Sequence, residues 1–126
     1  MNDIEKARNP HTSFKTLNQI SQGNLTHDLI EALLMNPSLP SDSLPELITK
    51  CSIDLQILAL KHPNLSSEQQ IDIISSINND QLRIKAKIVL LQRPDIGKDM
   101  LTVLCLDPDK QIRERALEKL LFKYRN

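Results

Sequence analysis

The segment LIEALLMNPSLPSDSLPEL, residues 29–47, contains the pattern that predicts the fold. Apolar residues stand eight and four positions before Pro37, and seven and ten positions after it: Leu29, Leu33, Leu44 and Leu47. Steps of about three, four or seven residues keep side chains on one face of an α-helix, so the segment predicts two amphipathic helices. The proline separates them, because it pushes the residue before it out of the α region.

The same arrangement recurs around three other prolines. The four junctions are Asn9-Pro10, Asn36-Pro37, His62-Pro63 and Arg93-Pro94, and their prolines are 27, 26 and 31 residues apart. The position ten residues after the proline is apolar in every copy: Ile20, Leu47, Ile73 and Leu104. Self-similarity at this period is typical of helical repeats, in which neighbouring helix pairs stack to bury a common core.

The repeat predicts an all-α chain. We expect short helices near residues 12–22, 41–50, 66–77 and 97–106, alternating with helices near residues 2–9, 25–36, 53–62, 81–93 and 108–125. Residues 82–88 also alternate apolar and polar side chains, which is a strand pattern, but their register with the other copies favours a helix. The expected architecture is one domain over residues 1–126, built as an α-solenoid of about four helix-pair repeats.

Residue types at the expected helix ends suggest how each end is closed. Residues 66–69, SSEQ, and residues 43–46, SLPE, have the pattern of capping boxes. In residues 107–109, DPD, Asp107 is expected to be an N-cap with Pro108 in the first turn. Gly23 is expected to end the helix before it in the left-handed conformation.

The final repeat is similar to a known family. Residues 107–117, DPDKQIRERAL, resemble the core of the bacterial leucine-rich repeat variant, whose repeat runs roughly Asp-Pro, Val-Arg, Val-Ala and Asn-Pro. The Asn-Pro junctions at residues 9–10 and 36–37 look similar too. The resemblance implies a right-handed superhelix in which α-helices alternate with shorter, sometimes 3₁₀, helices.

The chain also departs from that family's pattern. The family's arginine falls on Arg113, whereas Ile30, Gln56 and Lys87 occupy the position in earlier copies. HEAT-like helical repeats are therefore the alternative. Some family members carry an iron–sulfur module, but its cysteine cluster is absent here, so the resemblance implies no cofactor. The family has no settled biochemical activity, and the resemblance therefore bears on fold more than on function.

Composition agrees with a helical, cytoplasmic protein. The sequence has two glycines and three aromatic residues, Phe14, Phe122 and Tyr124, and all-β folds need more of both. No apolar stretch is long enough for a membrane span, and residues 1–8 contain no signal core. Cys51 and Cys105 lie in apolar runs and are expected to be buried free thiols, not a disulfide or zinc site.

The sequence contains no recognisable catalytic constellation. Two isolated glycines cannot form a phosphate-binding loop, and His11, His27 and His62 share no ligand spacing. His62 occupies the position held by Asn9 and Asn36 in other copies, so we expect a junction residue, not a base. The chain is therefore expected to be no enzyme, with no cofactor and no metal.

Charge is unevenly distributed along the chain. The net charge is zero, but residues 1–80 carry five Lys and Arg against ten Asp and Glu, and residues 81–126 carry eleven against six. A field of this shape can steer a charged partner to one end, although solvated faces also scatter charge in this way.

Two classes of binding function follow from these patterns. The leading expectation is a protein-interaction module, either a scaffold or adaptor or a small inhibitor-type binder, with Phe122 and Tyr124 as candidate anchors and Met35 and Met100 as further contacts if exposed. The alternative for Phe122 and Tyr124 is a terminal cap that packs on the preceding helices. A homodimer is also expected to be possible, through the short helix at residues 2–9.

The alternative function is nucleic-acid binding through the basic end of the chain. The candidate phosphate contacts are Arg83, Lys85, Lys87, Arg93, Lys110, Arg113, Arg115, Lys119 and Lys123. The interleaved acids Glu114 and Glu118 count against it, and so does the lack of aromatic residues between the basic ones for stacking bases.

Overall fold

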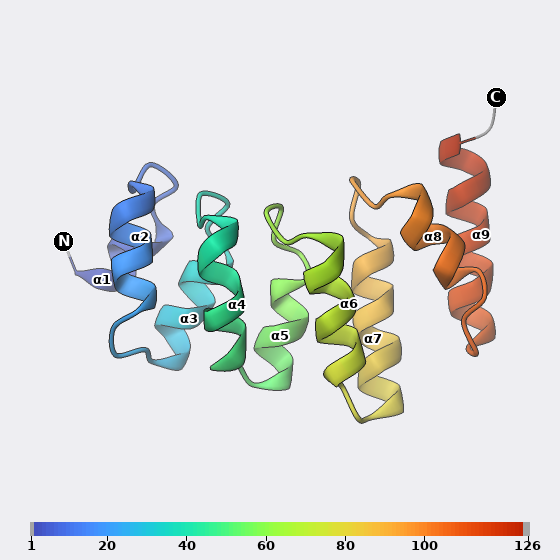
Figure 1. Ribbon diagram of the computed structural model, residues 1–126, viewed down its shortest axis with the longest axis horizontal. Helices are drawn as coiled ribbons and strands as arrows, with labels where there is room; N and C mark the ends of the chain where they lie inside the picture. The colour runs from blue at the N-terminus through green and yellow to red at the C-terminus, as the bar shows by residue number, and fades with distance from the viewer. Residues whose placement is uncertain (1, 125–126) are drawn as a thin grey trace. The chain divides into compact units, whose positions relative to one another are not determined.

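The structure is a computed structural model that describes residues 2–124, with Tyr124 described by its backbone only (Figure 1). Within residues 2–124 the chain is all-helical and contains no strand. No helix in this part is long and apolar enough to cross a lipid bilayer. The elements are α1 (Asp3–Arg8), α2 (Phe14–Ser21), α3 (His27–Leu34), η1 (Ser41–Ser43), α4 (Leu44–Thr49), α5 (Ile53–Ala59), α6 (Ser67–Ser76), α7 (Asp80–Leu91), α8 (Lys98–Leu104) and α9 (Lys110–Tyr124).

The chain divides into two compact units, an N-terminal unit, Met1–Ile73, and a C-terminal unit, Ile74–Asn126. Their boundary falls inside α6. The single domain expected over residues 1–126 stays a prediction.

The N-terminal unit is built from successive helix pairs. Helix α1 packs against α2 and α3, and α5 packs against α3 and α4. Figure 1 shows α1, α3 and α5 behind α2 and α4, so that the unit has two helical layers. The residues at the predicted stripe positions fill the space between them, and four leucines there are almost wholly inaccessible to solvent: Leu17, Leu33, Leu44 and Leu47.

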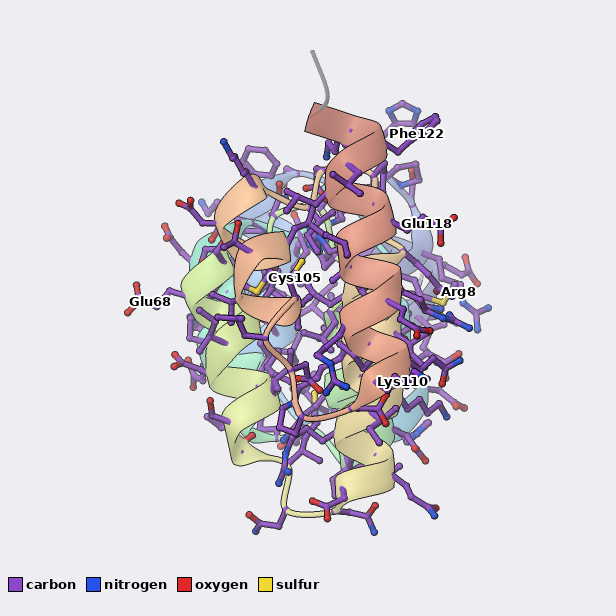
Figure 2. All side chains as sticks on the ribbon, turned by 90° about the vertical axis from the view of Figure 1, so that its right-hand side faces the viewer. Arg8, Glu68, Cys105, Lys110, Glu118 and Phe122 are labelled. Carbon is purple, nitrogen blue, oxygen red and sulfur yellow. The ribbon has the colours of Figure 1, made fainter. Side chains whose placement is uncertain are left out.

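In the C-terminal unit, α9 packs against both α7 and α8. Figure 2 shows α8 and α9 side by side. The core of this unit is a cluster of apolar residues from all three helices and the loops between them: Leu90, Leu91, Ile96, Met100, Leu101, Leu104, Ile112 and Ala116.

Each of the four X-Pro junctions forms a tight turn with the same backbone hydrogen bond. The carbonyl oxygen of the residue before the proline accepts a hydrogen bond from the N–H three residues later, at N···O distances of 3.1 to 3.3 Å. Proline is favoured at the second position of such a turn, because its ring fixes φ near the required value. The donor–acceptor pairs are Thr12 and Asn9, Leu39 and Asn36, Leu65 and His62, and Ile96 and Arg93.

All nine predicted helical ranges contain a helix, whose ends differ from the expected ones by no more than three residues. The ambiguous stretch, residues 82–88, lies within α7 and is helical. The capping box at residues 66–69 is confirmed. The Gln69 N–H donates to Ser66 Oγ over 3.1 Å, and the Ser66 N–H donates to Gln69 Oε1 over 2.8 Å.

The capping box predicted at residues 43–46 is wrong. Ser43 makes no cap hydrogen bond, because residues Ser41–Ser43 form the 3₁₀ turn η1, which leads directly into α4. Its hydroxyl instead donates to Asn18 Oδ1 over 2.8 Å.

Two further predictions about helix ends are wrong. Asp109, not Asp107, caps α9, since the Ile112 N–H donates to Asp109 Oδ1 over 3.0 Å. Asp107 accepts the Asp109 N–H over 2.9 Å, which places Pro108 before the helix. Gly23 does not have positive φ, because α2 ends by tightening into i→i+3 hydrogen bonds, such as that from Gly23 N to Ile20 O.

Candidate interaction groove

Within each unit, side chains of one helix pair hydrogen-bond to the turn of the preceding pair. In the N-terminal unit, Asn36 Nδ2 donates to Ala7 O over 2.7 Å and to Asn9 O over 3.0 Å. One pair later, His62 Nε2 lies 2.7 Å from Asn36 O, and it must donate there because a carbonyl oxygen only accepts. These bonds satisfy carbonyl groups at helix ends and turns that have no partner within their own helix.

His62 is the junction residue expected from the sequence. Its Nδ1 accepts the Asn64 N–H over 3.1 Å, as Asn36 Oδ1 accepts the Ser38 N–H over 2.9 Å. The imidazole therefore reproduces both functions of an asparagine side chain: it accepts from its own turn and donates to the preceding pair.

Lysines have this function in the C-terminal unit. Lys119 Nζ donates to Leu91 O and, over 3.0 Å, to Arg93 O. Lys123 Nζ donates to Pro94 O over 2.9 Å and to Ile96 O over 2.8 Å. Partial burial, with added repulsion from Lys123, lowers the pKa of Lys119.

Two arginines proposed to contact phosphate also hold backbone carbonyls. Arg83 donates to Ile77 O from Nε over 3.1 Å and from Nη2 over 2.7 Å, and its Nη1 pairs with Asp80 over 2.9 Å. Arg113 Nη1 donates over 2.8 Å to both Asp107 O and Pro108 O.

Two other candidate cations are largely buried. The ammonium group of Lys87 pairs with the Asp107 carboxylate, and both side chains are mostly inaccessible to solvent. Arg93 is buried and pairs with Asp95 through two hydrogen bonds, from Nε over 3.0 Å and from Nη2 over 2.9 Å. The hydrogen bond from Arg93 lowers the pKa of Asp95, against a smaller opposing effect of desolvation.

Three of the candidate cations are left exposed without a strong internal partner. Lys110 forms only a loose pair with Glu114, at 3.9 Å between Nζ and Oε1. Lys85 and Arg115 are exposed and have no hydrogen bond or ion pair with any described residue. The structure thus separates the predicted basic surface into cations that stabilise helix ends and a smaller set that faces solvent.

One of these exposed cations, Arg115, lines a groove between α7 and α9 with a volume of about 450 Å³. Arg115, Glu118, Lys119 and Phe122 share one face of α9, because their spacings are three and four residues. Helix α7 contributes Ile88 and Leu91, and its C-cap residue, Gln92, also lines the groove. Figure 2 shows Glu118 and Phe122 pointing from the side of α9 that lies away from α8.

Phe122 is the large apolar side chain of this groove, and 76% of its surface is exposed. The side chain of Tyr124 lies outside the described residues. Of the two methionines considered as contacts, Met35 is exposed and Met100 is buried in the core of the C-terminal unit. Ile88, Leu91, Gln92 and Glu118 were missed by the sequence reasoning, although α7 and α9 were both expected.

A second groove lies between α1 and α3 in the N-terminal unit. It has a volume of about 310 Å³ and is lined by Arg8, Asp28, Glu31, Ala32 and Met35. Glu31 and Ile88 each stand six residues before the proline of their junction, and Met35 and Gln92 each stand two residues before it, so both pairs occupy equivalent repeat positions. Each unit therefore has a groove between helices of two successive pairs, formed in part by equivalent repeat positions.

Of the two cysteines, Cys51 is a weak nucleophile. Both are half-buried free thiols, and burial raises the pKa of Cys51 to about 11, so that the protonated form prevails at neutral pH. Cys51 Sγ donates to Leu47 O over 3.3 Å. Within residues 2–124, no three His, Cys, Asp or Glu side chains are grouped to hold a metal ion.

No protein-family model matches the sequence, and no match was found among curated proteins or among solved structures either.

Proposed function

We propose that this chain is a non-catalytic, cytoplasmic protein-interaction module that binds its partner through the α7–α9 groove. It acts as a scaffold, an adaptor or a small inhibitor-type binder. The helix pairs form a right-handed α-solenoid of the leucine-rich repeat variant type, with HEAT-like repeats as the alternative.

The recurring turn supports the stacked arrangement. In the N-terminal unit, the carbonyl before the proline accepts a side-chain donor from the next pair at Asn9 and at Asn36. In the C-terminal unit, Arg93 O accepts from Lys119 in the same way. Bonds of one kind that recur within both units favour a constant step between pairs, and a constant step generates a superhelix.

The observation that carries the function is the exposure of Phe122 beside Arg115 in the groove. Aromatic and arginine side chains are over-represented among the residues that dominate binding energy at protein interfaces. Surfaces made by stacked helices are also the usual binding surfaces of repeat proteins. A non-catalytic role is supported by the high pKa of Cys51, which makes it a weak nucleophile.

Nucleic-acid binding is the second candidate, and it has less support. Residues 74–126 carry eleven Lys and Arg against seven Asp and Glu, which favours an anionic partner. However, six of the nine candidates already hold carbonyls or carboxylates: Arg83, Lys87, Arg93, Arg113, Lys119 and Lys123. Using them on phosphates would require breaking bonds that stabilise helix ends.

An affinity pull-down of the tagged full chain tests the proposal. The lysate is divided, one half is treated with nuclease, and recovered proteins are identified by mass spectrometry. We expect one protein in stoichiometric amount, unaffected by nuclease. Phe122→Ser should weaken its capture by more than about tenfold, because hot-spot side chains contribute about 2 kcal/mol or more.

Phe14→Ser is the matched control, because Phe14 is an exposed phenylalanine of the N-terminal unit, at 67% exposure. It should leave capture unchanged. Enrichment that disappears with nuclease would move the function to nucleic-acid binding, and equal loss in both variants would exclude the groove as the binding site.

A further inference from the structure

We propose that the α7–α9 groove takes an acidic segment of a partner protein, in which a carboxylate side chain stands next to a leucine-like apolar one. The inference rests on the proposed function and adds the chemistry of the partner. The evidence is the charge, the fixed donors and the apolar lining of the groove.

Arg115 provides the first contact. It is exposed and has no internal partner among the described residues, so all five of its N–H donors are available. A planar guanidinium group matches a carboxylate with two parallel hydrogen bonds, which gives both strength and orientation. An acidic side chain is therefore the natural partner of this position.

Lys119 provides the second contact. Two of its three N–H donors are held by Leu91 O and Arg93 O, so the ammonium group is fixed in position and has one donor left. Burial and Lys123 both disfavour its charged form. A carboxylate that approaches this side of the groove supplies the negative charge that would favour it again.

Arg115 and Lys119 stand four residues apart on α9, so their side chains are neighbours on one face of the helix. The groove carries two positive side chains against Glu118, a net charge of +1. Glu118 stands on the same face of α9, three residues after Arg115 and four before Phe122, and Figure 2 shows it on the side of α9 that lies away from α8. Glu118 therefore repels a carboxylate that binds in the wrong register.

The apolar lining determines what accompanies the carboxylate. Leu91 is buried at the base of the groove, Ile88 is half-buried, and Phe122 forms an exposed wall. A leucine-like side chain of the partner covers these surfaces and removes Phe122 from water. A segment with a carboxylate and an apolar side chain thus satisfies both kinds of surface.

The test is an NMR titration of the ¹⁵N-labelled full chain with three hexapeptides that are acetylated at the N-terminus and amidated at the C-terminus, so that only their side chains differ in charge. They have the sequences Asp-Leu-Leu-Asp-Leu-Leu, Asn-Leu-Leu-Asn-Leu-Leu and Lys-Leu-Leu-Lys-Leu-Leu. We expect the acidic peptide to shift the amide signals of Ile88, Gln92, Arg115 and Phe122. It should bind about tenfold more tightly than the neutral peptide, because charge-assisted bonds are roughly twice as strong as neutral ones.

Two variants separate a specific site from general attraction to a basic unit. Arg115→Gln should remove most of the acidic peptide's advantage over the neutral one, because only Lys119 remains to contact the carboxylate. Lys85→Gln removes an exposed cation that does not line the groove and should leave the affinity unchanged. Equal loss in both variants would overturn the inference, because long-range charge alone would then explain the binding.

Other outcomes also decide the matter. Equal or tighter binding of the neutral or basic peptide would overturn the acidic preference, and so would shifts that avoid the groove. The proposed function is judged separately by the pull-down. A partner whose capture depends on Phe122 but not on Arg115 would keep the function and reject this inference.

Discussion

The substitution Asn36→Ala removes a buried link between two helix pairs of the N-terminal unit. The Asn36 side chain is 2% exposed. It donates to Ala7 O over 2.7 Å and to Asn9 O over 3.0 Å, and its oxygen accepts the Ser38 N–H over 2.9 Å. Alanine makes none of these bonds and leaves both carbonyls without this donor.

The expected loss follows from the number of groups affected. A buried polar group left without its partner costs about 1–3 kcal/mol, and three partners lose a bond here. Partial relaxation and access of water reduce the sum, so we expect a loss of about 3 kcal/mol in the free energy of unfolding. With an m-value of about 2 kcal/mol per molar, the urea midpoint falls by about 1.5 M.

The assay is equilibrium unfolding in urea, followed by circular dichroism. Asn24→Ala is the matched control, because Asn24 is exposed and makes no hydrogen bond with the described residues; it should change stability by less than about 0.5 kcal/mol. Asn36→Asp is a sharper test of the donor. It keeps the acceptor for Ser38 but turns a carboxylate oxygen toward the two carbonyls, so it should destabilise at least as much as alanine.

A loss in Asn36→Ala no larger than that in Asn24→Ala would refute the reasoning. Wild-type stability in Asn36→Asp would show that the amide nitrogen does not donate to the preceding helix pair. Either result would also weaken the proposed stack, which depends on such links.

Three other predictions concern different parts of the chain. Lys87→Met should lower the free energy of unfolding by about 3 kcal/mol, because it leaves the Asp107 carboxylate buried without its ammonium partner. Urea unfolding measures the loss, with Lys110→Met as the control at an exposed site, and equal losses in the two variants would contradict the prediction. In a Cys105→Ser background, Cys51 should react with iodoacetamide at pH 8 about 100-fold more slowly than an unperturbed thiol, and its rate should increase as the pH rises toward its pKa of about 11. A rate at pH 8 equal to that of an unperturbed thiol would show that Cys51 is not buried. Light scattering over a range of concentrations should reveal growth toward twice the monomer mass if the α1 end self-associates, and a monomer throughout would reject the dimer.

Secondary structure was predictable because each helix has its own apolar stripe. Leu33 and Leu90 stand four residues before their prolines, and both are wholly buried. The proline marks the junction locally, since it restricts its own φ and the residue before it. These effects act within a few residues, so they can be recognised in one sequence.

Helix ends were harder to predict because several residues compete to cap the same turn. Asp107 and Asp109 both have the chemistry of an N-cap, and the choice depends on the distant Lys87, which binds Asp107. Ser43 has the residue type of a cap, but Asn18 of α2 takes its hydroxyl hydrogen bond. Tertiary partners decided both cases.

The candidate site was only partly predictable for the same reason. Phe122 and Arg115 could be named as exposed types on an expected helix, and the structure places both in one groove. Whether a cation faces solvent depends on how far its side chain reaches. Lys119 reaches Leu91 O, which is 28 residues away in sequence, and no local pattern indicates such a contact.

Photo-crosslinking from within the groove is the most direct test of its function. Gln92, an exposed residue of the groove, is replaced by p-benzoylphenylalanine in the tagged full chain and irradiated in cells. The same replacement at Gln81, which is exposed at the start of α7 and does not line the groove, serves as the control. We predict one protein adduct from position 92, resistant to nuclease and absent from position 81. Adducts to nucleic acid, or the same adducts from both positions, would contradict a protein-binding groove.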